Sequence, residues 1–253
     1  MKKPLFSCVI PVKGPRPFFD EALKSLQNQG LGDDLEIIIQ DADIEPDKGQ
    51  SDALNKGFAK ARGEWLFWLN ADDVLLPGAL KSLEFRVKSL EFKDVEWIAG
   101  DTVYIDENGI VKDVRTDAKW MPWFGAHLSV WTGGPSSFFR RGLWERHGGL
   151  GVNLKYVMDI DLWTRWAKKG IRFRGVGRYV WGFRMHAGSK TMGGECNDEY
   201  YAERVGVAES HNLKHQKIWR FATRVLSIIN GSWFKRVIDR KRFFGFNWKG
   251  ITQ

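Results

Sequence analysis

The sequence contains only two cysteines among 253 residues, Cys8 in an apolar run and Cys196 in a glycine-rich stretch. Two cysteines cannot form a framework of disulfide bridges, and their spacing is not that of a cysteine-based metal site. The composition therefore excludes a disulfide-stapled secreted fold and a cysteine-rich metal module. We expect a reducing, cytoplasmic compartment.

The sequence also lacks long hydrophobic runs, repeats, low-complexity tracts and a recognisable linker. Its first apolar stretch, Leu5–Ile10, is broken by Pro11 and is far shorter than the roughly 20 residues that a membrane span needs. We therefore expect neither a signal peptide nor a transmembrane helix. Hydrophobic residues make up 43% of the chain and charged residues 28%, which is ordinary for a globular protein that buries one large core.

A cluster of acidic residues is the most informative feature that the sequence does contain. Asn70-Ala71-Asp72-Asp73 directly follows the apolar run Trp65–Leu69, and a helical pattern begins at Pro77. This order places carboxylates at the carboxyl end of a buried strand, where open α/β sheets bind ligands. Such oxygen ligands suit Mg²⁺ or Mn²⁺ carrying a diphosphate, so the cluster predicts a nucleotide-sugar enzyme. The alternative is a solvated acidic turn that caps the helix at Pro77.

The first third of the sequence alternates between strand and helix patterns. Such an alternation predicts a parallel sheet with right-handed connections and helices on both faces. The expected elements are a strand at Phe6–Val12, a helix from Arg16 to Gly30, a strand at Leu35–Ile39, a helix at Gly49–Ala61 and a strand at Trp65–Leu69.

The second half changes character. Trp97–Ile105 and Ile110–Val114 flank the turn signal Asp106–Gly109 and predict a small antiparallel insertion. A helix is expected at Asp159–Lys169, followed by closing strands at Ile171–Phe173 and Tyr179–Phe183.

The net charge of +8 is concentrated toward the C-terminus, where basic and apolar residues interleave from Arg204 onward. This pattern predicts a helical extension over residues 213–253, after a main domain at 1–212. A basic amphipathic helix pair could lie in a membrane interface, as a peripheral contact on the inner face, or pack on the catalytic core. The sequence contains no compact basic-aromatic motif for nucleic acid, so we expect no nucleic-acid partner.

Six stretches occur in the order found in one enzyme family. The sequence resembles the family 2 inverting glycosyltransferases with the GT-A fold, and within them the group that builds cell-surface polysaccharides. The resemblance covers about residues 5 to 191 and is carried by FSCVIPVKG, LEIIIQDAD, EPDKGQSDALNKGFAKARGEWLFWLNADDVLLPGAL, GPSSFFRRGLWERHGGL, MDIDLWTRWAKKG and FRMHAGSKT.

The resemblance implies a Rossmann-type, mostly parallel sheet and a defined reaction. A sugar would pass from a nucleotide-diphosphate sugar, with a UDP-sugar favoured, to a hydroxyl of a saccharide or lipid-linked acceptor. Mn²⁺ or Mg²⁺ would be the cofactor.

The resemblance also implies donor-binding residues. Asp41 would contact the nucleobase or ribose, although an Asx turn is the alternative for this residue. Lys48, Gly49, Asp52 and Asn55 open a helix whose N-terminus suits phosphate, although loop and capping roles fit the same residues. The remaining implied donor contacts are Pro11, Val12, Asn70, Ala71, Arg184 and Lys190, the last two as positive charges toward the diphosphate.

The implied metal ligands are Asp72, which matches the second Asp of the family's DxD-type motif, and His186. Asn70 replaces the usual first Asp, which removes one negative charge and predicts weaker metal affinity. The alternative for His186 is a polar loop residue without a ligand.

The implied general base is Asp159, with Asp161 as the alternative, in a motif where Met158 replaces the commoner Glu. Inverting transfer needs such a base to take the proton of the acceptor hydroxyl. An N-terminal helix charge is the non-catalytic interpretation of Asp159. The acceptor side would be lined by Trp131, Gly133 and Gly134.

Two further functions compete with this interpretation. A nucleotidyltransferase also combines an α/β sheet with acidic metal ligands, but Pro11–Arg16 is a weak version of the phosphate loop that it needs. A degenerate nucleotide-sugar-binding module is disfavoured because Asp72 and Asp159 are intact. The segment after Asp43 is much shorter than in the family, which predicts a nucleotide pocket that is open on that edge.

Overall fold

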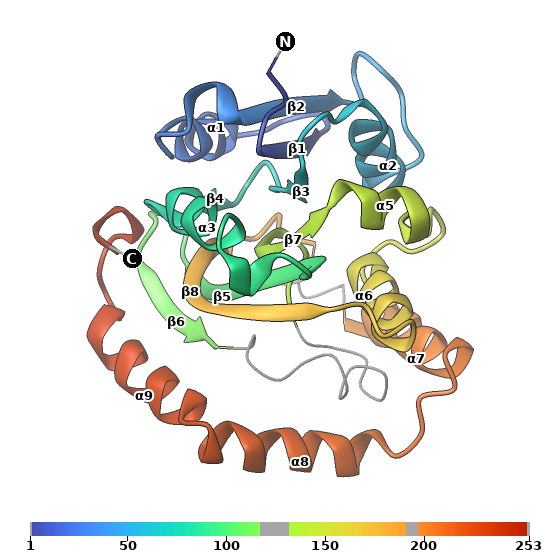
Figure 1. The fold of residues 1–253 in the computed structure, drawn as a ribbon, viewed down its shortest axis with the longest axis vertical. Coiled ribbons are helices and arrows are strands. Elements are labelled where there is room, and N and C mark those ends of the chain that lie inside the picture. The colour runs from blue at the N-terminus through green and yellow to red at the C-terminus, as the bar shows by residue number, and fades with distance from the viewer. Residues whose placement is uncertain (1, 117–131, 191–196, 252–253) are drawn as a thin grey trace.

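The computed structural model describes residues 2–116, 132–190 and 197–251, and Figure 1 shows its fold. The strands are β1 (Phe6–Val12), β2 (Leu35–Asp41), β3 (Trp65–Trp68), β4 (Val74–Leu75), β5 (Trp97–Ile105), β6 (Val111–Arg115), β7 (Ser137–Arg140) and β8 (Phe173–Arg184). The α-helices are α1 (Phe19–Gln27), α2 (Gln50–Lys60), α3 (Ala79–Val87), α5 (Arg141–His147), α6 (Met158–Lys168), α7 (Asn197–Ser210), α8 (Gln216–Ile229) and α9 (Ser232–Phe243). Short 3₁₀ turns are η1 (Gly32–Asp34), η2 (Leu90–Phe92), η3 (Gly134–Ser136) and η4 (Trp248–Gly250).

One eight-stranded sheet organises the molecule, in the order β2-β1-β3-β7-β5-β8-β4 with β6 paired to β5. β1 runs parallel to both β2 and β3, and β8 runs parallel to β5. β7 is antiparallel to its neighbours β3 and β5. Because β1 and β3 are parallel, the residues that follow Val12 and Trp68 lie at the same edge of the sheet.

The central strand β3 is buried on both faces, which explains its unbroken apolar sequence. Trp65 and Phe67 pack into a core with α1 and α3, whereas Leu66 and Trp68 pack into a second core with α2, α5 and α6. Figure 1 shows these helices on the two sides of the sheet. The predicted α/β fold class is confirmed.

The second core is built largely from tryptophan. The Trp163 ring stacks on those of Trp68 and Trp97, with centroids 5.9 and 4.9 Å apart. Trp163 and Trp166 are fully buried on α6, so this helix is fixed against the sheet and its first turn is held at the sheet edge. Packing of this kind positions the residues at the start of α6.

The observed elements differ from the expected ones in several places, and β4, β7 and α5 are not among the expected elements. The two expected closing strands form the single strand β8, whose pairing with β5 shifts register next to Asp101, and Gly177 in this strand has a φ of +63°. Helix α3 begins two residues after Pro77, because Gly78 adopts a left-handed conformation at its N-cap. Helix α7 was not expected, since its apolar residues follow no clear helical period.

The C-terminal helices α8 and α9 wrap around the outside of the sheet (Figure 1). The end of this extension packs on the core: Phe243, Trp248 and Ile251 are buried in one cluster with residues of β4, β5 and β6. Lys235 of α9 pairs with the buried Asp101 at 2.7 Å. The division of domains at residue 212 stays a prediction. Within the described ranges, every helix is too short or too polar to cross a membrane.

Candidate functional site

A cavity of about 620 Å³ opens at the carboxyl edge of the parallel strands. Its wall combines the loop after β1, the start of α2, the loop after β3, the start of α6 and the segment after β8. Ten of the residues predicted from the sequence lie on this wall: Pro11, Val12, Gly49, Asn70, Ala71, Asp72, Gly134, Asp159, His186 and Lys190.

Asp72 and His186 meet at the rim of this cavity. The His186 Nε2 atom lies 3.0 Å from the Asp72 Oδ2 atom, and the His186 side chain is 14% exposed. The Phe18 ring packs beside the imidazole, with centroids 5.1 Å apart. The two predicted metal ligands therefore come together although 114 residues separate them.

Asp73 has a different environment from its neighbour. It is buried, accepts a hydrogen bond from the Arg184 main-chain N–H at 2.9 Å and another from the Asn70 amide at 2.8 Å. Burial and the adjacent Asp72 carboxylate raise the pKa of Asp73 well above its usual value. Asp73 thus fastens the loop after β3 to the end of β8, and Asp72 is the carboxylate that remains available to a ligand.

Asp159 lies on the first turn of α6, on the wall of the cavity. Its Oδ2 accepts the Gly134 N–H at 3.0 Å, and its Oδ1 accepts the Ile160 N–H at 2.8 Å. Burial raises the pKa of Asp159 from 3.8 to about 6, and these hydrogen bonds oppose the shift. A carboxyl group that titrates near neutral pH in a cavity is suited to proton transfer.

Asp161 is engaged elsewhere. Its carboxylate pairs with His211 Nε2 at 2.8 Å and with Arg165 Nε at 2.9 Å, which links α6 to the end of α7. Residues two apart on a helix point in different directions, so Asp159 and Asp161 cannot both face the cavity. We therefore keep Asp159 as the candidate base.

The start of α6 has a support that sequence reasoning missed. The Glu203 carboxylate of α7 accepts the main-chain N–H groups of Lys155, Tyr156 and Val157 at 2.8, 2.8 and 3.3 Å. These donors precede the first turn of α6, so Glu203 fixes the approach to Asp159.

A polar chain crosses the cavity from Lys190. The Lys190 ammonium donates to Gln50 Oε1 at 3.1 Å, and the Gln50 amide donates to Asn70 Oδ1 at 2.8 Å. Asn70, which stands where the family has its first Asp, in turn donates to Asp73. Gln50 was not among the predicted residues, although its position directly after Gly49 could have suggested it. Other lining residues missing from the sequence prediction are Lys13, Arg16, Phe18, Lys155 and Tyr156.

Arg184 does not fit the donor role predicted for it. The side chain is fully buried, and its Nη2 pairs with Glu21 Oε2 at 2.5 Å. Its Nε donates to the Asp72 main-chain carbonyl at 2.9 Å. Because a buried guanidinium is stable only with such partners, these contacts use Arg184 inside the protein, and we leave it out of the proposed donor contacts.

Several other predicted donor residues make structural contacts within the protein. Asp52 accepts the Lys48 main-chain N–H at 3.0 Å near the start of α2, and Asn55 exchanges two hydrogen bonds with the main chain of Leu150. Asp41 accepts the Asp43 N–H at 3.0 Å, which is the Asx-type contact that was its alternative. The pairing of Asp41 with Arg16 at 2.7 Å lowers the pKa of Asp41 and brings this strand end next to the cavity wall.

The glycines predicted on the acceptor side are closely packed. A Cβ atom on Gly134 would lie 1.9 Å from Trp68 Cζ2, and one on Gly133 would lie 2.1 Å from Trp181 Cζ3. Glycine is thus required for the close approach that brings the Gly134 amide to Asp159. Trp131 lies outside the described residues.

The residues at the rim fit a divalent cation. Among the described residues there is no group of three or more His, Cys, Asp or Glu side chains that could hold a metal ion. Mg²⁺ in nucleotide sites is bound by one or two protein ligands, and substrate phosphates and water complete its shell. The 3.0 Å between Asp72 Oδ2 and His186 Nε2 is about the separation of two adjacent ligands in an octahedral shell. Asp72 and His186 could therefore hold Mg²⁺ or Mn²⁺ together with a diphosphate.

Comparison with known proteins adds evidence from sequence. Residues 43–135 match the model of Glycosyl transferase family 2. An uncharacterized glycosyltransferase of Methanocaldococcus jannaschii, MJ1057, is 25% identical over 218 residues, which cover 73% of this chain and 72% of that protein. The GalNAc(5)-diNAcBac-PP-undecaprenol beta-1,3-glucosyltransferase of Campylobacter jejuni is 30% identical over 104 residues, 32% of this chain and 33% of that enzyme.

Solved structures share the fold. The S. aureus TarS 1-349 structure in complex with UDP-GlcNAc has a TM-score of 0.63 at 14% identity and covers 85% of this chain and 69% of its own. The mannosyltransferase PcManGT from Pyrobaculum calidifontis, in complex with GDP-Man and Mn²⁺, has a TM-score of 0.57 at 16% identity over 91% of this chain and 76% of its own. The family model over residues 43–135, the similar glycosyltransferases and the shared GT-A fold together support a family 2 glycosyltransferase.

Proposed function

We propose that this glycosyltransferase transfers a sugar from a nucleotide-diphosphate sugar, with inversion, to a hydroxyl of a saccharide or lipid-linked acceptor in the synthesis of a surface polysaccharide. The observation that carries the proposal is the single cavity wall shared by Asp72, His186, Lys190 and Asp159. It combines two cation ligands, a cationic side chain and a carboxyl group with a pKa of about 6.

Each of these groups has a defined task in the proposed reaction. Lys190 and the N-terminus of α2 at Gly49 favour the negative charge of the diphosphate. Asp72 and His186 would hold a divalent cation, which when bound neutralises charge on the leaving diphosphate. Asp159 accepts the proton of the acceptor hydroxyl as that oxygen attacks the anomeric carbon.

The donor is proposed to be a UDP-sugar. TarS has been solved with UDP-GlcNAc and with UDP, which favours this base, although PcManGT was solved with GDP-Man. The lipid-linked acceptor is supported by the C. jejuni glucosyltransferase, whose name specifies an undecaprenol-linked oligosaccharide.

A panel of UDP-, GDP- and TDP-sugars, each with and without Mn²⁺ or Mg²⁺, tests the proposal. We expect one nucleotide sugar to raise the melting temperature and to be hydrolysed slowly in the presence of the cation, and proton NMR of the product should show inversion at the anomeric carbon. For the variant Asp159→Asn, the matched control is Asp161→Asn, because Asp161 pairs with His211 and Arg165. Retention of configuration, or binding of no nucleotide sugar, would refute the proposal.

We also propose that the C-terminal helices contact an anionic membrane surface. Large apolar side chains of α8 and α9 are exposed: Ile218, Phe221, Val225, Ile228, Ile229, Trp233, Phe234, Val237 and Ile238. Residues 213–251 contain ten Lys or Arg and a single acidic residue, Asp239, which accepts the Tyr179 hydroxyl. Exposed apolar and basic side chains on one helix pair match an interface with anionic lipid.

Substitution is a better test of this contact than truncation, because Phe243, Trp248 and Ile251 belong to the core. Replacing Phe221 and Ile229 with Ser should abolish binding to vesicles that contain phosphatidylglycerol, without a loss of thermal stability. The control Phe85→Ser removes an apolar side chain from α3 that is at least as exposed as Phe221 and Ile229. Failure of the wild-type chain to bind such vesicles at low salt would refute the membrane contact.

A further inference from the structure

Arg184 lies at the centre of a buried polar network that the proposed reaction does not use directly. It ends β8, and its side chain is fully buried. The guanidinium donates to the Asp72 carbonyl at 2.9 Å, to the carbonyls of Asp106 and Glu107 at 3.3 and 3.0 Å, and to Glu21 at 2.5 Å. A buried guanidinium with this many partners holds a fixed position, since losing any one of them leaves charge or donors unsatisfied.

The same residue determines where both candidate cation ligands stand. Its side chain holds the main chain of Asp72, its main-chain N–H holds Asp73, and His186 follows it by two residues. Phe18 adds a second restraint, because its ring lies 4.6 Å from the Arg184 guanidinium and 5.1 Å from the His186 ring. The contact between Asp72 and His186 is therefore built on Arg184.

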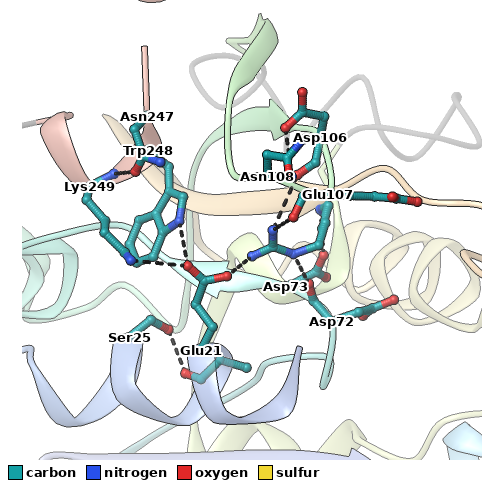
Figure 2. A network of polar contacts seen from close by, with 12 residues as sticks. Glu21, Ser25, Asp72, Asp73, Asp106, Glu107, Asn108, Asn247, Trp248 and Lys249 are labelled. Carbon is teal, nitrogen blue, oxygen red and sulfur yellow. Dashed lines mark hydrogen bonds and ion pairs between the residues drawn. The ribbon is translucent and has the colours of Figure 1, made fainter. Parts of the chain in front are cut away.

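Glu21 orients the guanidinium and is itself held by the C-terminal segment. Its other carboxylate oxygen accepts the Trp248 indole N–H at 3.3 Å and pairs with the Lys249 ammonium at 3.4 Å. Figure 2 shows Glu21 between Trp248 and Lys249 on one side and the Asp72–Asp73 segment on the other.

The turn that supplies the two carbonyls to Arg184 is also fastened to the C-terminal segment. The Trp248 main-chain N–H donates to the Gly109 carbonyl at 3.0 Å, and a Cβ atom on Gly109 would lie 2.8 Å from the indole ring. Trp248 is 5% exposed, so its ring closes this side of the network. Both partners of Arg184 outside the site, Glu21 and the 106–109 turn, thus contact Trp248.

We propose that Arg184 is a positioning residue for the transfer reaction, and that Glu21 and Trp248 hold its guanidinium so that Asp72 and His186 stay in ligand geometry. The inference rests on the proposed function, because it assigns Asp72 and His186 to a cation. Arg184 touches neither donor nor acceptor in this scheme and acts through the main chain of Asp72.

Conservative substitutions on the full-length chain test the inference. Glu21→Gln keeps the shape but removes the charge that faces Arg184, and Trp248→Phe keeps a buried ring but removes the indole N–H. The control is Glu84→Gln on α3, where the carboxylate also has two cationic partners, Lys81 and Lys88. We expect Glu21→Gln to weaken Mn²⁺ binding, measured by electron paramagnetic resonance with UDP present, by about 10-fold, the lower end for partners behind a metal ligand. Trp248→Phe should weaken it less, and Glu84→Gln should leave it unchanged.

Hydrogen exchange without metal provides a second readout that separates this inference from the proposed function. Amides of residues 70–76 and 182–188 should exchange faster in Glu21→Gln and Trp248→Phe than in Glu84→Gln. The inference would be overturned if Glu21→Gln left hydrogen exchange in these two segments unchanged. It would also be overturned if Glu21→Gln bound Mn²⁺ with the affinity of the wild type. If the wild-type chain binds no Mn²⁺ but the two segments still loosen, the cation assignment falls and the positioning role of Arg184 stands.

Discussion

Replacing Asp159 with Asn tests the catalytic assignment through the dependence on pH. The pKa of Asp159 is about 6, because burial on the cavity wall disfavours its charged form. A general base must be ionised, so the wild-type rate should follow the ionised fraction, which rises from roughly one tenth at about pH 5 to roughly nine tenths at about pH 7. Across this window we expect the rate constant for transfer to increase about tenfold.

The assay is the initial rate of UDP release at saturating donor and cation, measured at several pH values in buffers of constant ionic strength. Asp159→Asn should retain donor affinity and lose about 10² to 10⁴ in rate, and its residual activity should lack the rise near pH 6. Asp161→Asn should keep the wild-type pH profile. A variant Asp159→Asn that still shows the rise would refute the assignment, since another group would then be the base.

The same pKa has a consequence for stability, and its sign follows from linkage. The folded-state pKa of about 6 lies above the ordinary value of 3.8, so the folded chain binds this proton more tightly than the unfolded chain does. The stabilising contribution is complete below about pH 4 and is lost as the pH rises through about 6, and it amounts to about 3 kcal/mol at most. The Asn side chain does not titrate, so Asp159→Asn does not lose this stabilising contribution. Between about pH 4 and about pH 6, the free energy of unfolding in urea should therefore rise for Asp159→Asn relative to the wild type. If the difference in unfolding free energy between Asp159→Asn and the wild type stays constant with pH, the raised pKa of Asp159 is contradicted.

Three further substitutions test other parts of the site. Asp72→Ala should abolish metal-dependent donor binding in calorimetry while circular dichroism stays native, and undiminished stimulation by Mn²⁺ would exclude Asp72 as a ligand. Lys190→Ala should raise the KM for the donor by about 10-fold with little change in kcat, since it removes a charged contact; an unchanged KM would show that Lys190 does not touch the diphosphate. Gly134→Ala should lower the free energy of unfolding by about 1–3 kcal/mol, because its Cβ would lie 1.9 Å from the Trp68 ring, and a stable variant with full activity would show that the turn can shift.

The sequence predicted the parts of the site that depend on local order. Asp72 follows a strand whose residues are all apolar, so its place at the sheet edge follows from periodicity and topology. Asp159 was predicted from the resemblance to the family, and it lies on the first turn of α6. The choice between Asp159 and Asp161 could not be made from spacing, because it depends on His211 and Arg165 occupying Asp161.

The roles of charged residues outside these motifs required the three-dimensional structure. Arg184 was expected at the diphosphate because cations commonly bind phosphate, yet its partners come from α1, the loop after β3 and the 106–109 turn. Glu203 supports the start of α6 from a helix whose sequence gave no amphipathic signal. Contacts between segments so far apart in the chain leave no trace in local periodicity.

The contact between Glu21 and Trp248 also bears on the order of folding. It joins residues 227 positions apart, so it closes a loop that contains nearly the whole sheet. During synthesis, β1, β2 and β3 can pair before the rest of the sheet, because all three end by Trp68 and their chain segment is made first. The environment of Arg184 forms only after residue 248 has been made, so a nascent chain that already carries Asp72 and His186 still lacks the support for their geometry. Catalytic competence should therefore be one of the last properties that this protein acquires as it folds.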